Sequence, residues 1–146
     1  MKIAAWSLIA VAVCIVALVA ASLIRADRDF RAMVGGSQSV GIKSLDFDGQ
    51  HRTAGFHDTE TAEYLSRRFR LAAKTSTNQS GGLSFNIRLV LSTGWAINGD
   101  ALVFEDLRQI RIGVPEIPIG ENDYWFVDID TNAPPKLIDL MRFLSR

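Results

Sequence analysis

The acidic residues with the clearest potential for chemistry lie near the C-terminal end of the chain. Asp128, Asp130 and Asn132 occupy alternate positions, and Asp139 lies eleven residues after Asp128. Carboxylate and amide oxygens at such intervals resemble the ligands of a calcium-binding loop. The pattern departs from that loop because Ala133 replaces the glycine that makes its sharp turn. We therefore interpret the segment as a strand end followed by a helix cap, with calcium binding as the alternative.

The two histidines, His51 and His57, give little support for a metal centre or a catalytic triad. On one strand they would lie ~20 Å apart, because a strand rises ~3.3 Å per residue. No third ligand is spaced to complete a zinc site, and no Gly-x-Ser-x-Gly elbow marks a nucleophile. We expect no cofactor, no metal and no enzymatic activity. An envelope hydrolase with dispersed catalytic residues is the enzymatic alternative.

Recognition of a partner is a role that the large apolar residues of the C-terminal half could fill. The candidates are Trp95, Ile117, Ile119 and Trp125, and the two isoleucines lie beside two prolines in the segment Pro115–Asn122. Bulky apolar side chains on such loops often anchor a protein partner. The competing interpretation is that they complete the core of a small domain.

A long apolar segment precedes all of these residues. Residues Ile3 to Ile24 contain no charge, no proline and no glycine. As a helix they would extend ~33 Å, enough to cross a hydrocarbon core of ~30 Å. The segment exceeds the ~7–15 apolar residues of a cleavable signal peptide and continues past the possible cleavage site at positions 19–21. We interpret it as a retained single-pass membrane anchor, with a cleaved signal as the alternative.

The charges around the apolar segment bear on which side of the membrane the domain faces. Lys2 precedes the segment, whereas three arginines and two aspartates come after it within positions 25–31. Counting basic residues alone would keep the second flank in the cytoplasm. A two-residue tail before a long apolar run is instead typical of a signal anchor that exports the domain on its C-terminal side. We expect an extracytoplasmic domain, periplasmic or external, at the cell membrane.

A stripe of small residues runs along the same segment. It consists of Ser7, Ala10, Cys14, Ala17 and Ala21, which recur at helical spacing. Small side chains allow two membrane helices to approach closely, so these residues are candidates for pairing with a partner helix. Small residues are frequent throughout the segment, and chance alone could also produce the stripe.

The rest of the chain predicts an α+β domain. We divide the sequence into a short tail (1–2), the anchor (3–24), a juxtamembrane helix and flexible link (25–37), and the domain (38–146). The expected order in the domain is β-β-α-β-β-β-β-α, with a mainly antiparallel sheet and both helices on one face. No βαβ rhythm of a nucleotide-binding sheet is present.

Local patterns define several of these elements. A helix is expected over 58–74, with Asp58 as its cap. Positions 83–91 alternate between apolar and polar residues, which predicts a strand with one packed face. Asp48-Gly49 and Asn98-Gly99 are typical hairpin turns. A change of apolar parity between Ile42 and Leu45 predicts a bulge.

The net charge excludes one class of partner. The chain has 16 basic and 16 acidic residues, whereas nucleic-acid binding needs a positive surplus. The sequence identifies no small-molecule substrate. We expect a membrane-anchored, non-enzymatic binding or assembly module that acts on an envelope protein or peptide. The alternative is a small-ligand or stress-sensing domain with a pocket between the sheet and the 58–74 helix.

Overall fold

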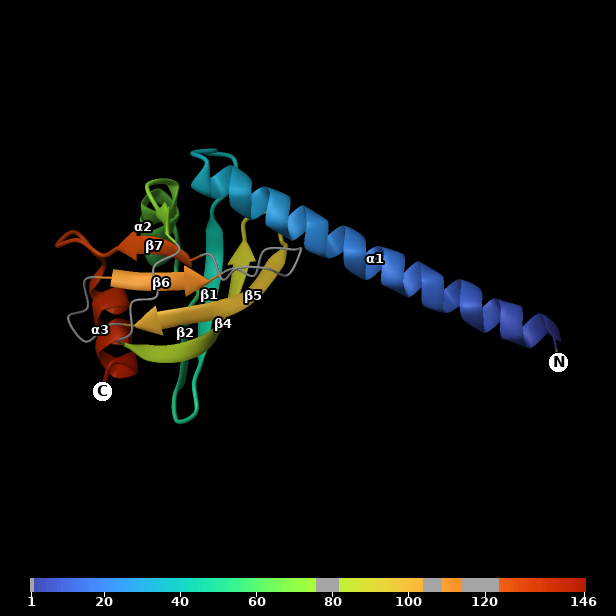
Figure 1. Cartoon of the computed structure of the whole chain (residues 1–146). Coiled ribbons are helices and arrows are strands. Elements are labelled where there is room, and N and C mark those ends of the chain that lie inside the picture. The colour runs from blue at the N-terminus through green and yellow to red at the C-terminus, as the bar shows by residue number, and fades with distance from the viewer. Residues whose placement is uncertain (1, 76–81, 104–108, 114–123) are drawn as a thin grey trace.

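The computed structural model describes residues 2–75, 82–103, 109–113 and 124–146. Three helices and seven strands occur in these ranges (Figure 1). In chain order they are α1 (Lys2–Val34), β1 (Ile42–Asp48), β2 (Thr53–Phe56), α2 (Thr59–Arg70), β3 (Ala73–Thr75), β4 (Leu83–Leu91), β5 (Ala96–Val103), β6 (Gln109–Gly113), β7 (Tyr124–Asp128) and α3 (Pro135–Leu144). The predicted α+β class is confirmed.

All seven strands form one sheet in the order β2-β1-β4-β5-β6-β7-β3. Every neighbouring pair is antiparallel, as predicted. The sheet is strongly twisted, and β6 and β7 run across the direction of β1 (Figure 1). The register of β1 against β4 shifts between Ile42 and Ser44, which confirms the predicted bulge.

One face of the sheet carries the core. On β4 the buried side chains are Phe85, Ile87, Leu89 and Leu91, while the side chains between them are exposed or half-buried. Buried residues of all three helices join the same apolar cluster. The helices therefore cover this inner face, and the outer face of β1, β4 and β5 remains polar and open in the part of the chain that the structure describes.

Polar contacts hold helix α2 at its N-terminal end and at Ser66 in its interior. Asp58 caps it as predicted, because its Oδ2 accepts hydrogen bonds from the backbone N (3.1 Å) and the Oγ1 (2.8 Å) of Thr61. Inside the core, the Ser66 hydroxyl donates to the Ala62 carbonyl (2.6 Å) and accepts from the Ile42 amide (2.7 Å). This buried hydroxyl fixes α2 against the start of β1.

The prediction that α2 extends to Lys74 is wrong. The helix ends at Arg70, and Ala73–Thr75 form strand β3, which is absent from the expected element order. β3 pairs with the edge of β7, where Ala73 lies opposite Phe126. Hydrogen bonding to this edge outweighs the local helical pattern, because tertiary pairing readily overrides weak propensity.

The hairpin predicted at Asn98-Gly99 is also wrong. β5 continues through both residues, and Gly99 is paired with Ile87 of β4. The turn lies earlier, where the Leu91 amide donates to the Trp95 carbonyl (2.8 Å). Gly94 adopts a φ of 89° there, a conformation that glycine tolerates and side chains disfavour.

The hairpin predicted at Asp48-Gly49 joins β1 and β2, although the return strand begins at Thr53 rather than at Gln50. The Gly49 amide donates to the Arg52 carbonyl (2.9 Å) and closes the loop. A side chain at Gly49 would come within 2.7 Å of the Phe85 ring. Close approach to this ring therefore requires glycine at the turn.

Helix α1 has two differently exposed halves. From Trp6 to Ile24 its large apolar side chains are exposed, whereas Ala26, Phe30 and Met33 are at most 4% exposed. The helix is long and apolar enough to cross a membrane by length and composition, with a mean hydropathy of 2.9 over its most apolar 18 residues. The packed core begins at Ala26, before the domain boundary that we expected at residue 38.

Candidate functional site

The point where α1 enters the domain combines a cation with an aromatic ring. The Arg25 Cζ lies 5.6 Å from the centroid of the Trp95 ring, within the range of a cation–π contact. Arg25 is the first charged residue after the apolar segment, and Trp95 ends the turn between β4 and β5. We call Arg25, Arg28 and the turn Ser92–Trp95 the helix–turn junction.

Backbone hydrogen bonds hold the turn of this junction in place. The Ser92 amide donates to the Gly41 carbonyl (2.8 Å), and the Gly41 amide donates to the Ser92 Oγ (2.9 Å). The Gly94 amide also donates to the Leu91 carbonyl (2.9 Å). Trp95 is therefore presented to Arg25 by a fixed turn, not by a freely moving loop.

Further charges lie along α1 after Arg25. Arg28 is exposed and pairs with the carboxylate of Asp29 at 3.2 Å, while the Asp29 side chain is only 11% exposed. Arg31 pairs with Asp27 at 2.9 Å. Arg25 and Arg28 therefore place exposed guanidinium groups directly beside the end of the apolar segment.

The other partner-binding candidates fall in different surroundings. Trp125 is half-buried on β7, and its ring packs edge-on against Phe30 of α1, with the centroids 6.1 Å apart. Phe30 packs in the same way against Phe69 of α2 at 6.1 Å. Trp125 thus contributes to the core contact of α1. Ile117 and Ile119 lie outside the described residues.

The residues of the calcium-like pattern are engaged in other contacts. Asp130 Oδ1 lies 3.0 Å from both the Tyr64 hydroxyl and the Asn132 amide, and its Oδ2 lies 3.2 Å from Arg68. The Asp130 amide donates in turn to the Tyr64 oxygen (2.9 Å). Arg68 also donates to the Asp128 carbonyl (2.6 Å). These contacts connect α2 to the segment after β7.

Asp139 is separated from that set. It lies on α3, is exposed, and pairs with Arg142 at 3.1 Å. Within the described ranges, no three histidine, cysteine or acidic side chains are grouped so that they could hold a metal ion. The structure therefore assigns Asp130 and Asn132 to a local turn that a hydrogen-bond network supports.

Ionisation strengthens this network. The hydrogen bond from Tyr64, followed by the Asn132 amide and the Arg68 charge, holds the pKa of Asp130 below its usual value of 3.8. Burial raises the pKa of Tyr64 above 10.0. At neutral pH the carboxylate therefore accepts and the phenol donates, which is the arrangement that the contacts require.

The outer sheet face is hollowed and polar. A shallow trough of about 460 Å³ crosses β1, β4 and β5, lined by Asp46, Asp48, Asn86, Ile87, Arg88, Asn98, Gly99 and Asp100. Asp46 lies opposite Arg88 in the register, and Arg88 lies opposite Asn98. The trough carries three carboxylates and one guanidinium, and His57 Nε2 adds a contact to Asp46 at 3.4 Å.

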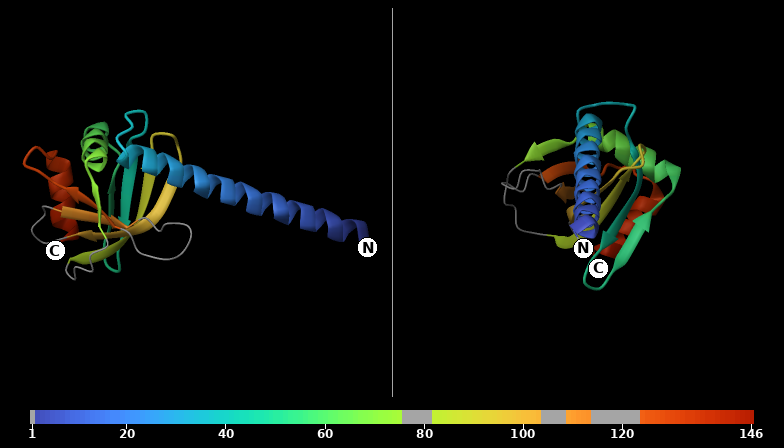
Figure 2. Two further views of the ribbon diagram at one scale, coloured as in Figure 1. Left: turned by 45° about the horizontal axis from the view of Figure 1, so that its top comes forward. Right: turned by 90° about the vertical axis from the view of Figure 1, so that its right-hand side faces the viewer.

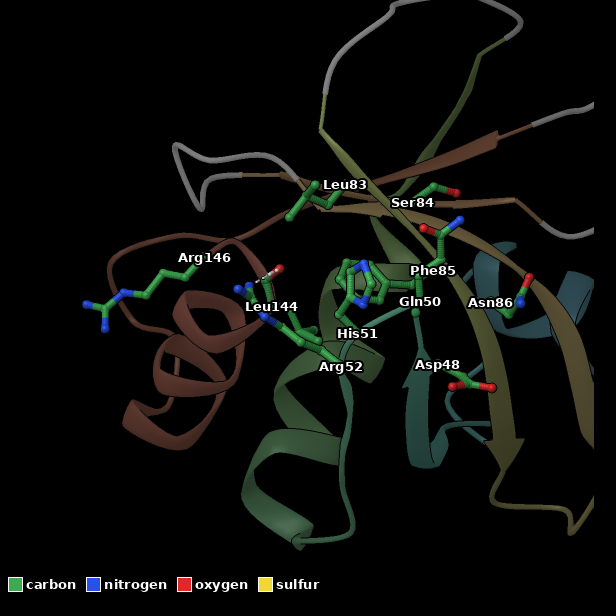
Figure 3. A pocket seen from close by; sticks show the side chains of 11 residues that line it. Asp48, Gln50, His51, Arg52, Leu83, Ser84, Phe85, Asn86, Leu144 and Arg146 are labelled. Atoms are coloured by element: carbon green, nitrogen blue, oxygen red, sulfur yellow. Dashed lines mark hydrogen bonds between the residues drawn. The ribbon is translucent and has the colours of Figure 1, made fainter.

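A larger open cavity of about 700 Å³ lies between the β1–β2 loop, the start of β4 and the end of α3 (Figure 3). Its polar lining includes His51, Arg52 and Arg146. Arg52 donates to the carbonyl of Phe143 (2.9 Å) and so caps the C-terminal end of α3. The small-ligand alternative placed its pocket between the sheet and α2, whereas this cavity lies at the β1–β2 hairpin.

Sequence reasoning did not find the Arg25–Trp95 contact, the Tyr64–Asp130 hydrogen bonds or the cap from Arg52. The sequence held one signal for the Arg25–Trp95 contact, because Gly94 directly precedes the tryptophan. A turn with a positive φ at Gly94 would have located Trp95 at the start of a strand. The other two join segments more than sixty residues apart. No local pattern marks such contacts.

Comparison with family models, curated proteins and solved structures finds no significant match to this chain. Its function must therefore be inferred from its own residues.

Proposed function

We propose that this chain is a single-pass membrane protein whose α+β domain is a non-enzymatic binding or assembly module for an envelope protein or peptide. One observation carries the proposal: a single helix has an exposed apolar half and a half buried in the domain core. The domain is thereby fixed to its anchor without a flexible link. We place it on the extracytoplasmic side, periplasmic or external.

The exposed half of α1 supports a lipid environment. Its exposed large side chains are Trp6, Leu8, Ile9, Val11, Val13, Ile15, Val16, Leu18, Val19, Leu23 and Ile24. They surround the helix, whereas a helix packed on a soluble core shows one apolar stripe. Contiguous apolar surface of this extent marks a membrane or a partner. The small residues Ser7, Ala10, Cys14, Ala17 and Ala21 lie on the same exposed half and offer a face for a second membrane helix.

We propose that the part of the partner outside the membrane binds to the outer face of the sheet. Helices α2 and α3 and the second half of α1 pack on the inner face of the sheet, and the free half of α1 projects beyond the domain (Figures 1 and 2). The trough lies on the opposite, open face. With three carboxylates against one arginine, it favours a basic segment of a partner.

Photocrosslinking in native membranes tests this assignment. A photoreactive residue at Asn98, which is exposed in the trough, should give a discrete adduct with a protein partner. The matched control is Glu63, an exposed residue on α2 at the opposite side of the sheet. An adduct from Glu63 but not from Asn98 would contradict the choice of surface. Release of the whole protein by a carbonate wash would contradict the anchor itself.

The cavity at the β1–β2 hairpin favours a second candidate, a domain that senses a small anionic ligand. Its volume falls within the ~300–1,000 Å³ typical of ligand sites; Arg146 supplies a cationic group and His51 an imidazole. A screen of small anions by thermal unfolding should find one that raises the melting temperature. The rise should disappear in Arg146→Ala. If no anion stabilises the domain, this candidate fails.

A further inference from the structure

The helix–turn junction lies at a defined depth relative to the apolar segment. Arg25 comes directly after Ile24, and Arg28 lies ~4.5 Å beyond Arg25 along the helix axis at 1.5 Å per residue. A headgroup layer extends ~5–7 Å on each side of the hydrocarbon core. If the apolar segment spans that core, both guanidinium groups lie within the headgroup layer.

Trp95 is held at the same depth by contact. Its ring centroid lies 5.6 Å from the Arg25 Cζ, and the hydrogen bonds between Ser92 and Gly41 fix the turn that carries it. Indole rings are enriched at the boundary between lipid and water, because they combine an apolar body with one N–H donor.

The continuity of α1 prevents the domain from tilting away. The helix runs unbroken from Lys2 to Val34, and burial begins at Ala26, one residue after Arg25. Phe30 then packs against Phe69 and Trp125, which belong to two other elements of the fold. Rotation of the domain about the membrane surface would require breaking either the helix or these contacts.

We propose that the helix–turn junction is a lipid-binding surface that docks the domain onto the headgroups of its own membrane. Arg25 and Arg28 donate hydrogen bonds to lipid phosphates, and the Trp95 ring lies at the lipid–water boundary beside them. This inference rests on the proposed anchor. It adds that the domain has one orientation, with the Ser92–Trp95 turn against the membrane and α2 away from it.

Site-specific labelling of the full-length chain tests the docking. In a Cys14→Ala background, Thr93→Cys places an environment-sensitive fluorophore on the turn beside Trp95. Glu63→Cys places the same fluorophore on the exposed face of α2 as the matched control. Both proteins are reconstituted into phosphatidylcholine vesicles with and without anionic phosphatidylglycerol, and quenching by lipids brominated near the headgroup is measured.

We expect the label at position 93 to be blue-shifted and quenched by the brominated lipid, and the label at position 63 to be neither. Anionic lipid should increase the quenching at position 93. The change Arg25→Gln should reduce that increase, because it removes one guanidinium group and keeps Arg28, which pairs with the nearly buried Asp29 carboxylate. Arg25 is exposed and forms no part of the buried cluster, so the urea unfolding midpoint should change little and the variant tests lipid contact separately from folding.

Two outcomes of this experiment separate the docking of the domain from the anchoring of the helix. Equal emission and quenching at positions 93 and 63, in protein that remains in the vesicles after a carbonate wash, would overturn the docking and leave the anchor standing. Loss of the protein from the vesicles would instead overturn the proposed anchor, and the docking with it.

Discussion

The two parts of α1, before and after Arg25, differ in composition and in exposure. Between Trp6 and Ile24 the large side chains are exposed around the whole helix, and no charge interrupts them. After Arg25 the buried apolar residues are Ala26, Phe30 and Met33, which recur at the spacing of one helical face. Charged residues occupy the positions between them. The comparison shows how one continuous helix can present an apolar surface, as the proposed anchor requires, over its first part and join a protein core over its second.

Arginines in the first half of α1 should give the largest effect. Val13→Arg with Leu18→Arg should prevent membrane integration, because each arginine near the centre of a span costs about 2.5–3.5 kcal/mol. Both positions are exposed in the structure, so the circular dichroism and cooperative unfolding of the domain should be retained. The measurement is partition after a carbonate wash, with Glu63→Arg as the charge-adding control. A double variant that stays in the pellet like the wild type would contradict a lipid-facing first half.

Truncation in the second half should damage the domain instead. Phe30→Ala should lower the free energy of unfolding by about 3–5 kcal/mol, since it removes a ring that is 1% exposed and leaves a cavity between α1, α2 and β7. Urea unfolding in detergent micelles measures the loss. Val16→Ala, in the exposed half, is the matched truncation and should leave the midpoint unchanged. Equal midpoints for both variants would show that α1 does not share the core.

Phe69→Ala tests the contact between Phe30 of α1 and Phe69 of α2 from the side of α2. Its ring is fully buried and packs on Phe30, so we again expect a loss of about 3–5 kcal/mol. The double variant should lose less than the sum of the two single losses, because residues in contact are not independent. Strict additivity in the urea unfolding data would indicate that the two rings do not touch.

Contacts outside α1 should matter less to stability. Tyr64→Phe removes the hydroxyl that bonds to the Asp130 carboxylate and amide. We expect a loss of about 1 kcal/mol, the usual net contribution of a protein hydrogen bond, measured by the same urea unfolding. A loss as large as that of Phe30→Ala would mean that this network, rather than the apolar contact of α1, dominates the fold.

The smallest expected effect is a change in acid sensitivity. The pKa of Asp130 is held below 3.8 in the folded state, chiefly by the Tyr64 hydrogen bond. A lowered carboxyl pKa contributes stability that is present above the unfolded value and is lost as the pH falls through the folded one. Asp130→Asn should therefore lose stability less steeply than the wild type below about pH 4. Parallel pH profiles of the unfolding midpoint would contradict the assignment.

Local chemistry predicted much of this fold from the sequence. The Asp58 cap, the bulge after Ile42 and the alternation of β4 each depend on neighbouring residues, and each agrees with the structure. The wrong predictions concern a turn for which the sequence offered two signals and a strand that forms by pairing with a distant segment. Asn98-Gly99 is the stronger hairpin dipeptide by type, but Gly94 makes the turn. The Ala73–Thr75 segment becomes a strand only because the edge of β7 is available to it.

The candidate surfaces were less predictable for the same reason. The apolar segment could be identified from the sequence alone, because its hydrophobicity is a property of consecutive residues. The Arg25–Trp95 contact joins positions seventy residues apart in the chain, and the trough depends on the register of three strands. Trp125 was a candidate for binding a partner by residue type alone, whereas its position against Phe30 results from how α1 packs.

Hydrogen exchange of the full-length protein in lipid vesicles tests most directly whether α1 is one helix shared between lipid and core. The decisive probes are the backbone amides of positions 25–31, which follow the apolar segment and include the first core residues, Ala26 and Phe30. We predict slow exchange through these positions, as slow as in α2, with no break after Ile24. Exchange within seconds at positions 25–31, with α2 still protected, would show a flexible link and contradict the account.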